Sequence, residues 1–291
     1  MKEASFYEKL ADDSVRCRVC NHYCVIKNNQ RGICGVRENQ SGKLYALNYG
    51  KTISYSIDPI EKKPLYHFLS KTKSYSLATV GCNLKCLWCQ NFEISQSPKP
   101  KKRIIGRDIT PEEHVKNALS RGCDSIAYTY SEPTIFLEYA YDIMKLAHEN
   151  NLKNVWVSNG FMSKDVLDYI LPLVDAFNID FKGFDDEMHK KYCGSPVKPI
   201  RDNLKTIYKS GVHLEVTTLV VPGFNDDLSE LTKIASFISE ELDNSVPWHI
   251  SRFYPAWKMS DTPPTDIDIL KRAKEIGESK GIKHIHLGNI Y

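Results

Sequence analysis

Three closely spaced cysteines carry the strongest chemical signal in the sequence. Cys82, Cys86 and Cys89 follow the pattern Cys-x3-Cys-x2-Cys, which supplies three thiolates and no fourth. A [4Fe–4S] cubane normally has four cysteine ligands, so three leave one iron open to a ligand that is not protein. The alternative interpretation is a structural zinc loop or an incomplete metal site. The spacing therefore predicts a cluster with one exchangeable position.

A second group of four cysteines lies nearer the N-terminus. Its spacing is Cys-x2-Cys-x3-Cys-x9-Cys, over Cys17, Cys20, Cys24 and Cys34. Four thiols so close in sequence can hold one metal, either tetrahedral zinc or a second [4Fe–4S] cluster. The spacing does not separate the two, and zinc is preferred because four closed ligands suit a structural site. His22 could replace one cysteine, although we expect it not to be a ligand.

Composition sets the broad class of the protein. The 291 residues carry a net charge of +3 and are 42% apolar, as in an ordinary globular enzyme, so nucleic-acid binding is not expected. The basic run Lys99–Arg103 is interpreted as a solvated loop rather than a docking patch. No apolar run reaches the roughly 18 residues of a membrane span, and the first residues lack a signal-peptide core. Nine cysteines then indicate metal ligands in a reducing, cytoplasmic setting.

Apolar runs that alternate with amphipathic segments predict the fold from residue 73 onward. The expected strands are Tyr75–Val80, Ser125–Tyr130, Asn154–Ser158, Ala176–Phe181, His213–Val220 and His249–Tyr254, with a further possible strand at His284–Leu287. The expected helices are Pro111–Ser120, Thr134–Glu149, Lys164–Leu171, Ile200–Lys209, Asp227–Glu241 and Thr265–Lys280. Six strand–helix repeats predict an α/β fold, an open partial (β/α)6 TIM-type barrel. Residues 1–72 are assigned to an N-terminal cysteine-rich metal-binding region and linker, and residues 73–291 to the barrel. Within the linker, 42–50 is expected to form a short strand or hairpin and 58–68 an ordered loop.

Polar residues lie on the expected strands or just after them, and βα barrels gather their chemistry at the strand ends. They are Ser131, Glu132, Ser158, Asn159, Asp180, Lys182, Glu215, Thr217, Thr218, His249, Ser251 and Arg252. Any one of them could be a helix cap or a loop residue, but together they indicate a binding site. Two cysteines stand apart from both groups: Cys123 is expected to be a buried apolar residue, and Cys193 could face the mouth of the barrel.

These features together resemble the radical S-adenosylmethionine (radical SAM) superfamily. Trp88, just before the last cysteine, and the strand expected before Cys82 both fit that family. The resemblance implies that the open iron chelates SAM and that an electron from the reduced cluster releases a 5′-deoxyadenosyl radical. The branch it resembles is that of pyruvate formate-lyase-activating enzymes. Within that branch it is similar to the AmmeMemoRadiSam system radical SAM enzymes, through the N-terminal cysteines, the segments 81–83 and 89–91, and the segment 58–68.

The resemblance also suggests roles for the strand-end residues. Glu132 would contact the methionyl amino group of SAM, although this sequence lacks the two glycines of the family motif. Ser158 and Asn159 resemble a Thr-Asn-Gly element that meets the ribose or methionyl end. Asp180 and Lys182 resemble an Asp-x-Lys motif that holds a monovalent cation and contacts the SAM carboxylate region. His249 resembles a SAM-contacting histidine, although a core histidine is an equal alternative, and the turn Val221–Asp226 resembles a shaping loop at the barrel mouth.

The expected function is therefore hydrogen abstraction by a SAM-derived radical from a protein or peptide substrate, either activase-like or modifying a side chain. Reduced ferredoxin or flavodoxin would supply the electron. Only about twenty residues separate Cys89 from Thr110, so the ferredoxin-like insert of several activases is absent. The alternatives are a radical SAM enzyme acting on a small molecule and a non-catalytic iron–sulfur electron carrier or redox sensor, which would not need the strand-end residues. The substrate, the fate of SAM and the oligomeric state do not follow from the sequence.

Overall fold

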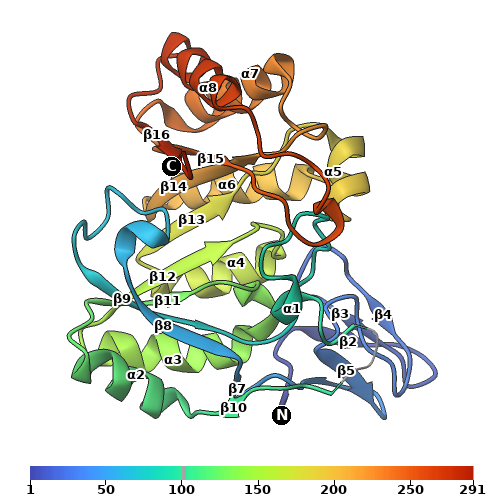
Figure 1. The fold of residues 1–291 in the computed structure, drawn as a ribbon. Coiled ribbons are helices and arrows are strands. Elements are labelled where there is room, and N and C mark those ends of the chain that lie inside the picture. Colours follow the sequence, from blue (N-terminus) through green and yellow to red (C-terminus); the bar gives the residue numbers. More distant parts are fainter. Residues whose placement is uncertain (100–102, 291) are drawn as a thin grey trace. The chain divides into compact units, whose positions relative to one another are not determined.

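The computed structural model describes residues 1–99 and 103–290, and the chain divides into two compact units (Figure 1). Unit 1 comprises Met1–Asn83 and Asn91–Ala176, and unit 2 comprises Leu84–Gln90 and Phe177–Tyr291. Residues 100–102 of the predicted basic loop lie outside the described residues. Neither unit ends at residue 72, so the division into 1–72 and 73–291 stays a prediction.

Small antiparallel sheets form the N-terminal region of unit 1. One has the order β1-β6-β5, from Lys2–Glu3, Lys43–Ala46 and Arg37–Gln40. Another has the order β2-β3-β4, from Tyr7–Lys9, Val15–Cys17 and Val25–Ile26, and β7 (Lys51–Thr52) pairs with β10 (Arg107–Asp108). The expected short strand within 42–50 is present as β6. The four N-terminal cysteines thus lie on or between short strands that pairing holds in place.

Parallel strands form the main sheet of unit 1. β9 (Lys73–Ala78), β11 (Ser125–Tyr128) and β12 (Lys153–Ser158) are parallel, with Ser125 opposite both Ser74 and Lys153. β8 (Ser54–Pro59) pairs antiparallel with β9 and was not predicted. The segment 58–68 was expected to be an ordered loop. Its first two residues instead end β8 and Ile60–Lys62 form the 3-10 turn η1, while residues 63–68 lie outside helices and strands. Pro59 fits because the last residue of an edge strand need not donate to the ladder.

Helices α2 (Pro111–Ser120), α3 (Leu137–Glu149) and α4 (Lys164–Ile170) complete unit 1 with the short helix α1 (Phe92–Ser95) and the 3-10 turn η3 (Leu171–Leu173). The predicted start of α2 is confirmed by a capping box, in which Thr110 and Glu113 each accept the other's backbone N–H. The helix expected from Thr134 begins instead as the 3-10 turn η2 (Pro133–Phe136), capped by Glu132. One hydrophobic cluster in the core of this unit consists of Ile60, Leu65, Ala127, Val155 and Ala176.

Unit 2 repeats the strand–helix alternation. Its strands are β13 (Ala176–Asp180, whose first residue closes unit 1), β14 (His213–Val220), β15 (Trp248–Arg252) and β16 (Ile285–Gly288). β14, β15 and β16 are parallel, and the possible last strand is thereby confirmed. The helices are α5 (Asp186–Cys193), α6 (Lys198–Ser210), α7 (Leu228–Ser236) and α8 (Ile267–Ser279), and α7 continues as a π-helical segment, η4 (Phe237–Asp243). The sequence analysis missed α5 because this eight-residue helix buries only His189 and Cys193.

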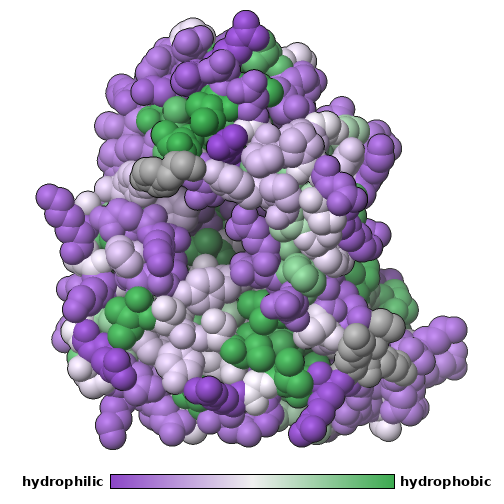
Figure 2. Space-filling view, in the orientation of Figure 1, coloured by the Kyte–Doolittle hydropathy of each residue, from purple (hydrophilic) through white to green (hydrophobic). Residues whose placement is uncertain are grey.

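Both units therefore have the predicted α/β character, with parallel strands β9, β11 and β12 in unit 1 and β14, β15 and β16 in unit 2. In the described part of the chain no helix is both long and apolar enough to cross a membrane. Figure 2 shows a face that is mostly hydrophilic, with apolar side chains in separate patches. Scattered exposed apolar residues are normal on a folded protein, so these patches by themselves indicate no docking surface.

Candidate active site

The predicted cluster loop is shared between the units: Cys82 belongs to unit 1, and Cys86 and Cys89 belong to unit 2. Cys82 follows β9 through Gly81, whose φ of +105° is a conformation that favours glycine. A Cβ atom at Gly81 would lie 2.8 Å from Val36 Cγ1 and 3.0 Å from the Cys34 carbonyl oxygen. The loop therefore begins in close contact with the N-terminal cysteine region of the same unit.

A hydrogen-bonded chain in unit 1 joins three of the predicted SAM-binding residues to Cys82. Glu132 is buried; its Oε1 accepts from Ser158 Oγ (2.8 Å) and its Oε2 from the backbone N–H of Asn159 (2.9 Å). The side-chain Nδ2 of Asn159 donates to Asn83 Oδ1 at 2.8 Å. The same nitrogen lies 3.9 Å from Cys82 Sγ. Burial raises the pKa of Glu132, and donors from Thr134, Ser158 and Asn159 oppose that shift. Glu132 and Ser158, expected at two strand ends, are thus linked to Cys82 through Asn159.

In unit 2 the structure brings Asp180 and Lys182 beside Cys86. Lys182 Nζ donates to Asp180 Oδ2 at 2.8 Å. Burial alone would lower the pKa of Lys182, but the charges of Asp180 and Cys86 raise it. The pKa of Cys86 is lowered, first by a hydrogen bond from Cys193 and, against burial, by Lys182. This environment favours a thiolate at Cys86, the form that binds iron.

His249 lies in a separate polar group of unit 2. Its Nε2 is 2.6 Å from Glu215 Oε2, and His213 Nε2 is 2.9 Å from the other carboxylate oxygen. The His286 ring stacks on His249 with centroids 5.0 Å apart. Alternation along β14 places His213 and Glu215 on one face, so the buried carboxylate can accept from both histidines. The predicted contact of His249 with SAM stays a prediction.

The motif 58–68 is held together by a buried ion pair in unit 1. Lys63 is 1% exposed, and its Nζ donates to Asp58 Oδ2 at 2.7 Å. Tyr130, which follows β11, donates its hydroxyl to the same oxygen at 2.5 Å. Burial would raise the pKa of Asp58, but these two donors lower it to about 2. Sequence reasoning noticed this motif without finding its partner, because Tyr130 is far away in the chain.

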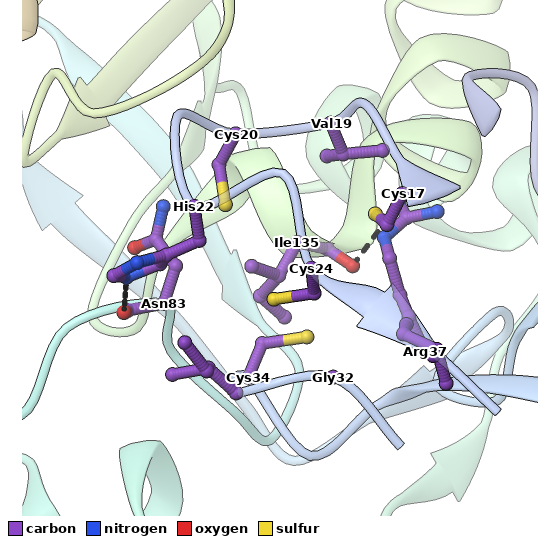
Figure 3. A pocket seen from close by; sticks show the side chains of 12 residues that line it. Cys17, Val19, Cys20, His22, Cys24, Gly32, Cys34, Arg37, Asn83 and Ile135 are labelled. Atoms are coloured by element: carbon purple, nitrogen blue, oxygen red, sulfur yellow. Dashed lines mark hydrogen bonds between the residues drawn. The ribbon is translucent and has the colours of Figure 1, made fainter. Parts of the chain in front are cut away.

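The four N-terminal cysteines line a single cavity in unit 1 (Figure 3). The sulfur atoms of Cys20, Cys24 and Cys34 point toward a common space, whereas Cys17 lies beside the Arg37 guanidinium. Among residues 1–99 and 103–290, no three His, Cys, Asp or Glu side chains are already gathered as metal ligands. Burial, opposed by Arg37, raises the pKa of Cys17 to about 12.

The surroundings of this cavity fit a thiolate-bound metal. Arg37 Nε is a buried donor that has no acceptor in the described structure, and Arg37 lies beside Cys17 and Cys34, whose thiolates would accept from it. The other guanidinium nitrogens bind Glu138 in a fully buried pair, at 3.0 and 2.7 Å. His22 donates Nε2–H to the Asn83 carbonyl oxygen at 2.8 Å, so this nitrogen is already used in a hydrogen bond to the backbone. Sequence reasoning missed Arg37 and Asn83, which look like ordinary strand and loop residues.

Comparison with known proteins identifies the family. The model of the Radical SAM superfamily matches residues 76–236. An uncharacterized protein of Methanocaldococcus jannaschii is 46% identical over 290 residues, which cover 100% of this chain and 86% of the relative. The pyruvate formate-lyase-activating enzyme of Clostridium pasteurianum is 24% identical, over 70% of this chain and 88% of that enzyme.

A solved structure shares the fold. The radical SAM methyltransferase of Sphaerobacter thermophilus matches with a TM-score of 0.57 at 13% identity, over 76% of this chain and 67% of that one. The chain therefore belongs to the radical SAM superfamily, as an enzyme of the branch that includes pyruvate formate-lyase-activating enzymes.

Proposed function

We propose that this enzyme cleaves SAM reductively and abstracts hydrogen from a protein or peptide substrate. The observation that carries the proposal is the chain from Glu132 through Asn159 and Asn83 to Cys82, which joins the predicted SAM-binding residues to a predicted cluster ligand. A [4Fe–4S] cluster bound by Cys82, Cys86 and Cys89 would supply the electron that converts SAM to methionine and a 5′-deoxyadenosyl radical.

The chain's own residues would bind and orient SAM. The Glu132 carboxylate would accept hydrogen bonds from the methionyl amino group, while Ser158 and Asn159 hold that carboxylate from behind. Lys182 would neutralise the negative charge of the SAM carboxylate, and Asp180 would hold Lys182 or a monovalent cation. For His249 we keep the proposed SAM contact, with Glu215 fixing the orientation of its ring. The six strand–helix repeats would form an open partial barrel around this site.

The N-terminal region, residues 1–72, is proposed to hold one zinc ion through Cys17, Cys20, Cys24 and Cys34. The sulfur atoms of three of these cysteines point toward a common space, and four closed thiolate ligands suit a tetrahedral zinc ion. A zinc ion there would fix the segment that contacts Asn83 through His22. A second [4Fe–4S] cluster remains the competing assignment, and metal analysis of the purified protein separates the two.

The choice of a protein substrate rests on relatives that are named for activating another enzyme, including that of C. pasteurianum. We propose reduced ferredoxin or flavodoxin as the electron donor and a cytoplasmic location. The experiment is anaerobic: the protein is reconstituted with iron and sulfide, given dithionite and SAM, and 5′-deoxyadenosine is quantified by mass spectrometry. Wild type should form it, and Cys86→Ala should not. An intact cluster without deoxyadenosine, with or without cell extract, would favour an electron carrier or redox sensor.

A further inference from the structure

Tyr130, two residues before the proposed SAM-binding residue Glu132, has a backbone conformation that tyrosine rarely adopts. Its φ is +61°, in the left-handed region, and Ser131 N–H donates to the Thr129 carbonyl at 2.8 Å across it. A hydrogen bond between residues i and i+2 around a positive φ is the rare, strained form of the γ-turn. A bulky residue keeps such a conformation only where the surrounding contacts hold it there.

The Tyr130 side chain is held by the buried ion pair of Asp58 and Lys63. Its hydroxyl donates to Asp58 Oδ2 at 2.5 Å, and Lys63 Nζ donates to the same oxygen at 2.7 Å. This Nζ lies over the Tyr130 ring, 4.6 Å from its centroid, which is within the range of a cation–π interaction. Asp58 and Lys63 are 6% and 1% exposed, so water weakens these contacts little. We call these three residues the Tyr130 anchor, and all of them belong to unit 1.

Two further hydrogen bonds hold the backbone of the turn. Asn91 Nδ2 donates to the Tyr130 carbonyl at 2.8 Å, and Ser131 Oγ donates to the Thr79 carbonyl at 2.8 Å. Thr79 comes three residues before the first cysteine of the predicted cluster loop, and Asn91 comes two residues after the last. The turn is therefore bound to the chain on both sides of that loop, within unit 1.

We propose that Asp58, Lys63 and Tyr130 are positioning residues for SAM binding: the anchor maintains the strained turn, and the turn sets the backbone of Glu132. This inference rests on the proposed function, in which the Glu132 carboxylate binds the methionyl amino group. Donors at the end of β12 hold the carboxylate itself, so the anchor acts on the other end of the same residue. Without the anchor the turn relaxes in the free enzyme, and SAM binding must then supply the free energy that restores it.

The first test compares alanine and glycine at residue 130, by anaerobic calorimetry of SAM binding to the reconstituted enzyme. Both substitutions remove the phenol, but only glycine adopts a positive φ without strain. Tyr130→Ala should weaken SAM binding about tenfold, because strain of this kind is large enough to change an equilibrium by that factor. Tyr130→Gly should bind SAM several-fold more tightly than Tyr130→Ala, although it has lost the same side-chain contacts.

Tyr128→Phe is the matched control, because Tyr128 lies on β11 and its buried hydroxyl donates to Asn154 Oδ1 at 3.0 Å. It removes a buried phenol hydrogen bond outside the turn and should leave the SAM affinity unchanged. Equal affinities of wild type and Tyr130→Ala would overturn the inference, and so would equal weakening in the alanine and glycine variants. Equal weakening in Tyr128→Phe and Tyr130→Ala would also overturn it, since loss of any buried tyrosine hydroxyl near this strand end would then have the same effect.

A second test needs no SAM and therefore separates the anchor from the proposed function. Tyr130→Phe, Asp58→Asn and the double variant are compared by urea unfolding. The double variant should lose less stability than the sum of the two single losses, because either substitution disrupts the same hydrogen bond. Additive losses would overturn the anchor. Coupled losses in a protein whose wild type binds no SAM would count against the proposed function instead.

Discussion

Replacing Glu132 by glutamine tests the centre of the proposed site. The Glu132 Oε1 atom accepts from Thr134 N–H (3.0 Å), Thr134 Oγ1 (2.5 Å) and Ser158 Oγ (2.8 Å), so the amide oxygen of glutamine must occupy that position. Its NH2 group then replaces Oε2 and faces the backbone N–H of Asn159, where two donors meet. The substitution changes few atoms but removes the acceptor that orients Asn159 toward Cys82.

The expected magnitude follows from these contacts. A buried hydrogen bond to a charged group contributes about 1.5–3 kcal/mol, and a donor left unsatisfied costs about 1–3 kcal/mol. The neutral amide avoids part of the cost of burying a charge, so we expect a loss of about 2–4 kcal/mol in the free energy of unfolding. If Glu132 also binds the amino group of SAM, a further loss of about 2 kcal/mol weakens SAM binding roughly 30-fold.

Two assays separate these effects: urea unfolding gives the stability, and anaerobic calorimetry on the reconstituted enzyme gives the affinity for SAM. Glu138→Gln is the matched control, because Glu138 is equally buried but pairs with Arg37. It should cost about 3–5 kcal/mol of stability by leaving Arg37 unpaired, yet leave SAM affinity unchanged in the folded protein. Equal SAM affinity in Glu132→Gln and wild type, or equal weakening in both variants, would refute the assigned role of Glu132.

Three further predictions concern the surrounding structure. Cys20→Ser should reduce zinc by about one ion per chain, measured by elemental analysis, while the cluster signal that depends on Cys86 persists; unchanged zinc would contradict the N-terminal site. Gly81→Ala should lower the free energy of unfolding by about 1–3 kcal/mol and reduce the iron content of the reconstituted protein. Alanine disfavours the positive φ of residue 81, and its Cβ atom would crowd Val36. An unchanged iron content would count against a tightly held loop. Burial lowers the pKa of His114 from 6.5 to about 4, so its contribution to stability is present above pH 6.5 and is lost as the pH falls toward 4. Relative to His114→Gln, wild type should lose up to about 3 kcal/mol over that range in urea titrations, and a constant difference would contradict the neutral buried state.

Local patterns made much of this protein readable from its sequence. The cysteine spacings, the strand–helix alternation and the Thr110–Glu113 capping box depend on residues close together in the chain. Their interpretation therefore needs only backbone periodicity and short-range hydrogen bonding. The same patterns failed at α5, where helix propensity was not accompanied by a long apolar stripe, and at β8, whose pairing with β9 is not a local property.

The sequence by itself determined which residue types could bind metal and SAM, because ligand chemistry belongs to the side chain and to its spacing. Only the tertiary structure decided their partners. Arg37 meets Glu138, 101 residues away, Glu132 meets Asn159 across two strands, and Lys85 donates its backbone N–H to the Cys193 carbonyl at a helix end. Burial then sets the strength of each contact. A charged group or thiol that is removed from water loses its hydration, and its stability then depends on the hydrogen-bond donors that folding brings to it.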